Sequence, residues 1–118
     1  MRATNAPASR ARRKRVLEMA KGFSGSRSKL IRMAYTATDR AMAYAYVGRK
    51  DKKIAYRQLW TQRINAACRA LDFKYSWLID GLNKANIEIN RKMLAEIAIN
   101  DPKAFSGLVE TAKKAIAE

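Results

Sequence analysis

Apolar residues recur at helical spacing in the last part of the chain. After residue 101 they occupy the i, i+3, i+4, i+7 and i+11 positions of one helix face: Phe105, Leu108, Val109, Ala112 and Ile116. Asp101-Pro102, just before this stripe, is a typical helix start, because an aspartate caps the first turn and proline fits the first helical position. The pattern therefore predicts a helix from about residue 102 with one face in a core.

Two shorter helices are predicted before it. Ser76 can cap a helix that runs to about Ala85 and is ended by Asn86, and Asn90 can cap the next one. The inward face of the first comprises Leu78, Ile79 and Leu82, and that of the second comprises Met93, Leu94, Ile97 and Ala98. Residues 70–118 are therefore expected to form a small helical domain.

The middle of the sequence predicts one very long helix. From about residue 29 to residue 71 there is no proline and only one glycine, Gly48, while alanine is frequent. At 1.5 Å per residue such a helix would be roughly 65 Å long, which is more than a domain of this size can cover. A bend near Gly48 is compatible with this prediction, whereas a break into two helices there is the alternative.

The end of this long helix carries its own apolar stripe. Trp60, Ile64, Ala67 and Leu71 follow one side, so we expect them to seat the helix on the C-terminal helices. Cys68 is interpreted as a small interior residue.

The N-terminal segment is poor in apolar residues. Residues 1–9 predict an extended tail, after which Ser9 can cap a helix from Arg10 to about Lys21. Gly22 fits the left-handed position that ends a helix, and residues 22–28 predict a loop. No segment shows the sustained alternation of a strand, so the predicted fold class is all-α.

Charge divides the chain into two parts. Residues 1–69 contain 18 Lys and Arg and three acids, whereas residues 70–118 contain seven of each, so the first part carries the whole net charge of +15. This asymmetry predicts a basic nucleic-acid-binding extension, residues 1–69, joined to a near-neutral domain, residues 70–118. So basic a chain opposes its own compaction and calls for a polyanion as partner.

Composition excludes several kinds of site. The 118 residues include no histidine and one cysteine, which excludes an internal disulfide, a Cys/His zinc site and an imidazole base. The acids are scattered, and the longest apolar run, residues 41–47, is too short to span a bilayer. We therefore predict no enzyme activity, no cofactor, no metal, no small-molecule substrate and no membrane partner. A homo-oligomer is not expected.

Basic residues gather in three clusters. Residues 10–15 (RARRKR) indicate nucleic-acid binding, with a solvated tail, a nuclear address or a mitochondrial transit peptide as alternatives. Residues 22–29 lack the spacing of a nucleotide-binding P-loop, and we interpret them as an elbow that brings Arg27 and Lys29 to phosphate. In the third cluster Arg49, Lys53 and Arg57 line one helix side, for which a solvated face is the alternative.

Aromatic and small residues are interleaved with these cations. Aromatic rings stack on unpaired bases in RNA recognition, with ordinary packing as the alternative, and the candidates are Tyr35, Tyr44, Tyr46, Tyr56 and Trp60. Trp60 is interpreted as a core residue. A stripe of alanines would permit close approach of the helix to an RNA backbone: Ala34, Ala37, Ala41 and Ala45.

Residues 53–69, KIAYRQLWTQRINAACR, resemble the signature of the L-twenty family of bacterial large-subunit ribosomal proteins. The fixed points of that signature fall on Lys53, Arg57, Leu59, Trp60, Arg63, Ile64, Asn65 and Arg69. The resemblance extends to ARRKR and AKGF near the N-terminus, to residues 43–46, and to residues 75–76, 87, 90–92, 94–95 and 101–102. It covers nearly the whole chain. The sequence departs from the family pattern after Tyr46, where Val47-Gly48 stand, and at Trp77, where a basic residue is expected.

The resemblance implies an extension and a long helix that thread through large-subunit rRNA, and a C-terminal domain that docks on the same RNA. It also implies neighbouring ribosomal proteins as partners and a role in subunit assembly without catalysis. We expect RNA contacts from the cations Arg10, Arg12, Arg13, Lys14, Arg15, Lys21, Arg27, Lys29, Arg32, Arg49, Lys50, Lys52, Lys53, Arg57, Arg63, Arg69, Lys74, Lys84, Arg91 and Lys92.

The predicted function is that of a structural constituent of the large ribosomal subunit, in the cytoplasm or in an organelle. An architectural DNA-binding protein that condenses nucleic acid is the alternative. An interfacial membrane peptide is less compatible with the sequence, because the basic N-terminal helix has no broad apolar face.

Overall fold

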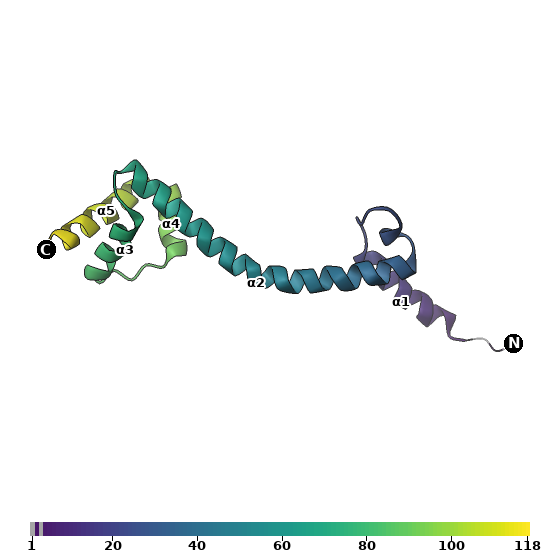
Figure 1. Cartoon of the computed structure of the whole chain (residues 1–118). Helices are drawn as coiled ribbons and strands as arrows, with labels where there is room; N and C mark the ends of the chain where they lie inside the picture. The colour runs from purple at the N-terminus through teal and green to yellow at the C-terminus, as the bar shows by residue number, and fades with distance from the viewer. Residues whose placement is uncertain (1, 3) are drawn as a thin grey trace. The chain divides into compact units, whose positions relative to one another are not determined.

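The computed structural model describes residues 2 and 4–118, and all the regular structure within them is helical (Figure 1). The elements are α1 (Ala6–Met19), a 3₁₀ helix η1 (Gly25–Ser28), α2 (Ile31–Ala70), α3 (Tyr75–Lys84), α4 (Arg91–Asn100) and α5 (Pro102–Ala117). The prediction of an all-α fold is confirmed. The chain divides into an N-terminal unit, Met1–Asp51, and a C-terminal unit, Lys52–Glu118, with the boundary inside α2.

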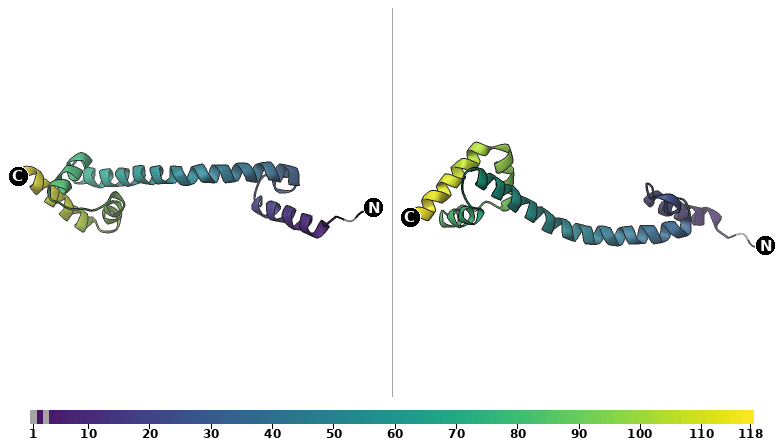
Figure 2. Two further views of the ribbon diagram at one scale, coloured as in Figure 1. Left: turned by 90° about the horizontal axis from the view of Figure 1, so that it is seen from below. Right: turned by 45° about the horizontal axis from the view of Figure 1, so that its top comes forward.

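Helix α2 is the long helix that the sequence predicts. Its 40 residues continue through Gly48 without interruption, so the alternative of a break there is wrong (Figure 2). At 1.5 Å per residue it is about 60 Å long. A single glycine lowers helix stability by only about 1 kcal/mol relative to alanine. The high helix propensity of the surrounding alanine-rich turns offsets this loss.

Helix α1 begins earlier than predicted. It starts at Ala6 with Asn5 as its N-cap residue, and Pro7 occupies the first turn, where its fixed φ suits a helix and its missing N–H is not needed. Ser9 is therefore inside the helix and is not its cap, and residues 6–9 are not an extended tail. Gly22 has the predicted left-handed φ of 88°, although α1 already ends at Met19.

The ends of α2 and α3 share one arrangement. The N–H of Phe73 donates to the carbonyl of Cys68 (2.9 Å) and the N–H of Asp72 to that of Arg69 (3.1 Å), with Asp72 at a φ of 54°. This is the Schellman motif, in which a left-handed residue lets the chain reverse and cap the last carbonyls. It turns Phe73 back into the core.

Asn86, at a φ of 56°, ends α3 in the same way, as predicted, with bonds from Ile87 to Leu82 (3.0 Å) and from Asn86 to Asn83 (3.1 Å). The predicted caps of the last two helices are also confirmed, because Asn90 accepts from the N–H of Met93 (2.9 Å) and Asp101 from that of Ala104 (3.1 Å). The predicted cap of α3 is wrong. That helix begins at Tyr75, so Ser76 is already within its first turn.

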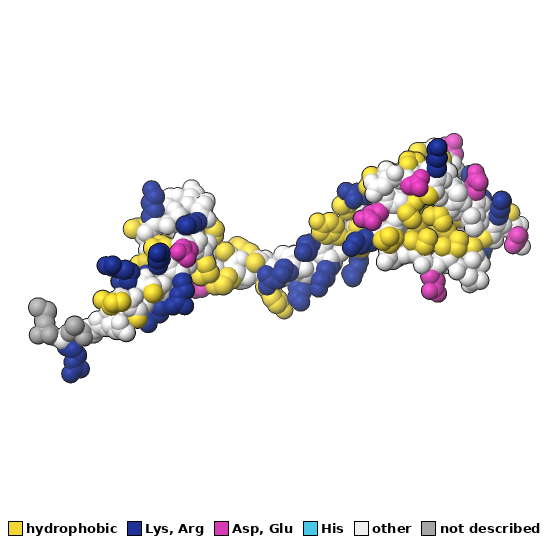
Figure 3. Space-filling view, turned by 180° about the vertical axis from the view of Figure 1, so that it is seen from behind, with side chains coloured by type: hydrophobic (Ala, Val, Ile, Leu, Met, Phe, Trp, Pro, Cys, Tyr) yellow, Lys and Arg dark blue, Asp and Glu magenta, His cyan; other side chains and the backbone are white. Residues whose placement is uncertain are grey.

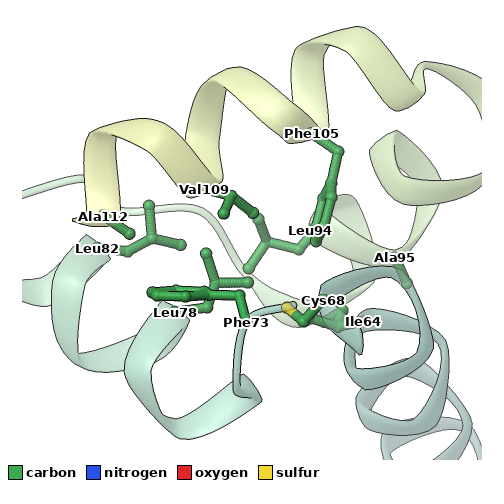
Figure 4. Packing of buried hydrophobic residues seen from close by; sticks show 10 residues of the cluster. All are labelled: Ile64, Cys68, Phe73, Leu78, Leu82, Leu94, Ala95, Phe105, Val109 and Ala112. Atoms are coloured by element: carbon green, nitrogen blue, oxygen red, sulfur yellow. The ribbon is translucent and has the colours of Figure 1, made fainter. Parts of the chain in front are cut away.

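The C-terminal unit contains the hydrophobic core (Figure 4). The buried cluster comprises Ile64, Cys68, Phe73, Leu78, Leu82, Leu94, Ala95, Phe105, Val109 and Ala112. As predicted, the last turns of α2 contribute to it, with Trp60 and Ala67 partly buried against the cluster. Leu71 is instead exposed, and Cys68 occupies the inward position. On α4, Met93 is exposed where the stripe predicted burial, and Ala95 is buried.

Helices α3 and α5 approach each other closely at Gly81. A Cβ atom at this position would lie 2.6 Å from both the Cβ and the carbonyl oxygen of Ala112. Both residues are buried. The backbone contact therefore requires glycine on α3, which the sequence pattern does not reveal.

We expect Gly81→Ala to lower the free energy of unfolding by about 1–3 kcal/mol, because the added methyl group forces α3 and α5 apart. Gly107→Ala on α5 is the matched control, since nothing lies within 4 Å of the position that its Cβ would take. It should stabilise the protein by up to about 1 kcal/mol through helix propensity. Urea unfolding followed by circular dichroism measures both changes, and an equal effect of the two would contradict the packing described here.

Candidate nucleic-acid interface

Every cation that the sequence proposes for RNA binding is exposed to solvent. Within residues 2 and 4–118 the only salt bridge joins Lys84 to Asp80 on α3, at 3.0 Å. Among the described residues, none of the other proposed cations forms a salt bridge with a carboxylate. Lys84 differs from them because its ammonium group already has an anionic partner.

The N-terminal cluster and the start of α2 form one basic hollow. Arg10, Arg13 and Lys14 on α1 and Lys29 before α2 line a depression of about 530 Å³, whose apolar wall is Leu17, Leu30 and Ile31. Four cations around one concave surface create a positive potential suited to a phosphate group. Cations distant in the sequence are thus brought together here, whereas Arg12 and Arg15 lie on other parts of α1 and do not line this hollow.

The elbow between α1 and α2 lies against the start of α2. Phe23 and Arg27, with the guanidinium carbon 6.0 Å from the ring centroid, share a pocket of about 360 Å³ with Ala37 and Ala41. Ala34 is fully buried. The first alanines of the predicted stripe are therefore covered by the protein itself, at least in part, which corrects the expectation that they approach an RNA backbone directly.

The same pocket reveals a basic residue that the sequence analysis did not select. Arg40 lines it together with Met33, Thr36 and Tyr44. Arg40 follows Asp39 in the sequence and lies outside the basic clusters, so charge density gave no reason to choose it. The available signal was its i, i+4 spacing to Thr36 and Tyr44 on one helix side.

The cations in the middle of α2 project into solvent. Arg49, Lys50, Lys52, Lys53 and Arg57 are all exposed, and Lys50 lies 5.2 Å from the ring centroid of exposed Tyr46. Figure 3 shows Lys and Arg side chains gathered along this helix, while most of the Asp and Glu side chains in view belong to the C-terminal unit. A helix with this surface offers a row of phosphate contacts.

In the C-terminal unit, cations of α2 share depressions with cations from later in the chain. Three separate depressions are each lined by one such pair. The pairs are Arg57 with Arg91, Arg63 with Lys92, and Arg69 with Lys74. Successive members of the α2 series are six residues apart, a rotation of about 240° around the helix axis. They therefore point in different directions, and the unit presents basic surface on several sides.

Arg91 is held in place by a specific bond. Its Nε–H donates to the hydroxyl oxygen of Tyr75 at 2.7 Å. The bond fixes the base of the guanidinium group near the start of α3 and leaves its two terminal nitrogens available. An arginine restrained in this way loses less conformational entropy when it binds a phosphate.

The described residues offer neither a cluster of metal ligands nor an exposed thiol. Residues 2 and 4–118 contain no cluster of three or more potential metal ligands, and Cys68 is fully buried. Burial raises the pKa of its thiol to about 11, so at neutral pH it is the unreactive thiol and not the thiolate. Over the same residues, no helix is long and apolar enough to cross a membrane.

Comparison with known proteins supports the family resemblance over most of the chain. The family profile described as "Ribosomal protein L20" matches residues 2–108. The protein named large ribosomal subunit protein bL20 of Elusimicrobium minutum is 52% identical over 118 residues, which is 100% of both chains. That of Thermoanaerobacter pseudethanolicus is 56% identical over 105 residues, 89% of this chain and 88% of its own. That of Clostridium beijerinckii is 54% identical over 113 residues, 96% of this chain and 95% of its own. The chain therefore belongs to the ribosomal protein L20 family.

Proposed function

We propose that this member of the ribosomal protein L20 family is a structural, non-enzymatic constituent of the large ribosomal subunit that binds large-subunit rRNA directly. The observation that carries the proposal is the exposed, almost unpaired basic surface of α1 and α2. Each phosphate that meets one of these cations releases condensed counterions, which supplies a favourable entropy of binding. Neutralisation also lowers the repulsion between RNA segments that converge on the helix, and in this way the protein assists subunit assembly.

We further propose that the two parts of the chain divide this work. The basic extension, residues 1–69, neutralises phosphates, whereas the near-neutral helices of residues 70–118 fix the register of the protein on the RNA by their shape. The core supports such a rigid platform, although it also includes Ile64 and Cys68 from α2. A fragment that begins at Lys52 keeps the whole buried cluster and is the suitable piece for an experiment.

The proposed partners are rRNA and the neighbouring proteins of the large subunit. The relatives named above are bacterial proteins, which supports a cytoplasmic ribosome as the location. The proposal includes no small-molecule substrate, no membrane partner and no homo-oligomer.

Competition between nucleic acids tests the function. We expect the full chain to bind large-subunit rRNA with a steep salt dependence and duplex DNA to compete poorly at physiological salt. Residues 52–118 alone should retain the preference for rRNA, since they hold the folded core, while residues 1–51 should bind both nucleic acids with little discrimination. Filter binding across a salt series measures these affinities. Equal binding of rRNA and DNA by the full chain would favour the architectural DNA-binding alternative.

Arg57→Ala tests one proposed phosphate contact. The substitution should weaken rRNA binding and reduce the slope of log K against log salt by about 0.7–0.9, the value for one phosphate. Lys103→Ala is the matched control, because Lys103 is an exposed cation of α5 outside the proposed interface. An unchanged slope for Arg57→Ala, or an equal change for Lys103→Ala, would remove Arg57 from the interface.

A further inference from the structure

One pocket of the C-terminal unit combines aromatic, cationic and anionic side chains. Tyr56, Trp60 and Arg63 of α2 and Lys92, Ala95 and Glu96 of α4 surround a volume of about 310 Å³. This is at the lower end of the range of about 300–1,000 Å³ that small ligands occupy in proteins. Its walls come from two helices that both contribute residues to the buried cluster, namely Ile64 and Cys68 of α2 and Leu94 and Ala95 of α4.

The aromatic wall is supported by the core. Trp60 is partly buried against the hydrophobic cluster, and Tyr56, one helical turn before it, is 49% exposed. Their ring centroids are 6.3 Å apart, with the planes tilted by 33°. Ala95 is fully buried, lies near α2 in Figure 4 and lines the same pocket as the two rings. A flat aromatic ligand can therefore contact ring surface that is already ordered.

Glu96 distinguishes this pocket from a simple phosphate site. It is an exposed carboxylate, and although Arg63 and Lys92 line the same pocket, neither pairs with it within 4.0 Å among the residues that the structure describes. A carboxylate repels phosphate, so at an RNA interface its favourable role is to accept hydrogen bonds from a base. Its two oxygens can accept two parallel bonds.

Among the four RNA bases, guanine matches this acceptor best. Its Watson–Crick edge presents the N1–H and the N2 amino group side by side, whereas adenine and cytosine each present one amino group and uracil one imino N–H. That edge is available only when the base is unpaired. Single-stranded and bulged bases are also those that stack on aromatic side chains in RNA recognition.

We propose that the pocket binds one unpaired guanine of the RNA. The base stacks on the Tyr56–Trp60 wall, the Glu96 carboxylate accepts from N1–H and N2–H, and Arg63 and Lys92 contact the flanking phosphates. The inference rests on the proposed binding of rRNA and adds to it a site that reads the identity of a base. The protein then has a source of specificity that its net charge cannot supply.

Chemical footprinting on large-subunit rRNA tests this proposal with the full chain. Kethoxal modifies N1 and N2 of unpaired guanines, the edge assigned to Glu96. We expect the wild-type protein to protect a guanine from kethoxal about tenfold, and Glu96→Gln to lose most of this protection at the same guanine. Glu110→Gln, an exposed acid of α5 outside the pocket, is the matched control and should keep it.

Removal of the exposed ring tests the stacking separately. Tyr56→Ala should also expose the guanine and weaken rRNA binding about tenfold, in line with the loss of one stacked base. Ile54→Ala, which removes an exposed apolar side chain of the same helix that does not line the pocket, is the control. In a Trp77→Phe background Trp60 is the only tryptophan, and its fluorescence should fall when rRNA binds and recover when the salt concentration is raised.

Hydroxyl-radical cleavage of the RNA backbone, measured on the same complexes, separates this inference from the proposed function. Backbone protection that persists in every variant, with no guanine protected from kethoxal or with protection unaffected by Glu96→Gln, would overturn the guanine site and leave rRNA binding intact. The absence of backbone protection by the wild-type protein would overturn both.

Discussion

Repulsion between like charges on α1 and α2 is the constraint on which the rest of the structure depends. The chain carries 25 basic and 10 acidic residues, and only one ion pair forms among the residues that the structure describes. The cations of α2 recur on neighbouring turns, where like charges destabilise an isolated helix. An external anion that screens these charges stabilises such a surface, so the charge pattern of the chain favours a polyanionic partner. The backbone hydrogen bonds of α2 are satisfied within the helix, which leaves its side chains free for that partner.

The C-terminal unit compensates for this repulsion by concentrating the apolar contacts. Ile64 and Cys68 tie the last turns of α2 to the helices that follow, and the close approach of Gly81 to Ala112 brings α3 and α5 together. The Schellman turn at Asp72 links α2 to α3, because it reverses the chain and places Phe73 in the same cluster. The last turns of the long helix are thus anchored by ordinary hydrophobic packing, whereas Arg49, Lys53 and Arg57 are exposed and lie outside the buried cluster.

The sequence predicted those features that local chemistry decides and missed those that depend on contacts. Asn90 and Asp101 were identified as caps because a side-chain acceptor before a helical stripe has few other roles, and Asn86 because asparagine tolerates the left-handed conformation. Ser9 failed as a cap because Pro7 starts α1 earlier, a competition between two valid start signals. Met93 was predicted to be buried and Ala95 was not, whereas the structure shows the reverse. A short helix allows two apolar stripes one residue apart, and only the packing of α4 against its neighbours decides between them.

The exposure of the candidate cations could be predicted from the sequence, because charged side chains are rarely buried, but their grouping on the surface could not. The sequence gives no indication that Lys29 joins Arg10 and Arg13, or that Lys92 joins Arg63, because such neighbours are set by the tertiary fold.

The proposed division between affinity and specificity accounts for the uneven placement of the acids. Met1–Asp51 contains 13 basic and three acidic residues, whereas Lys52–Glu118 contains 12 basic and seven acidic ones. Phosphate contacts position a protein on a nucleic acid but carry no sequence information, and a surface of cations alone binds any polyanion. In this proposal, the acids of the C-terminal unit lower that indiscriminate attraction in the part of the protein that holds the buried cluster. A surface with reduced charge discriminates by shape and by hydrogen bonds. The acids therefore lower the affinity of the C-terminal unit for any polyanion and leave its specificity to these contacts.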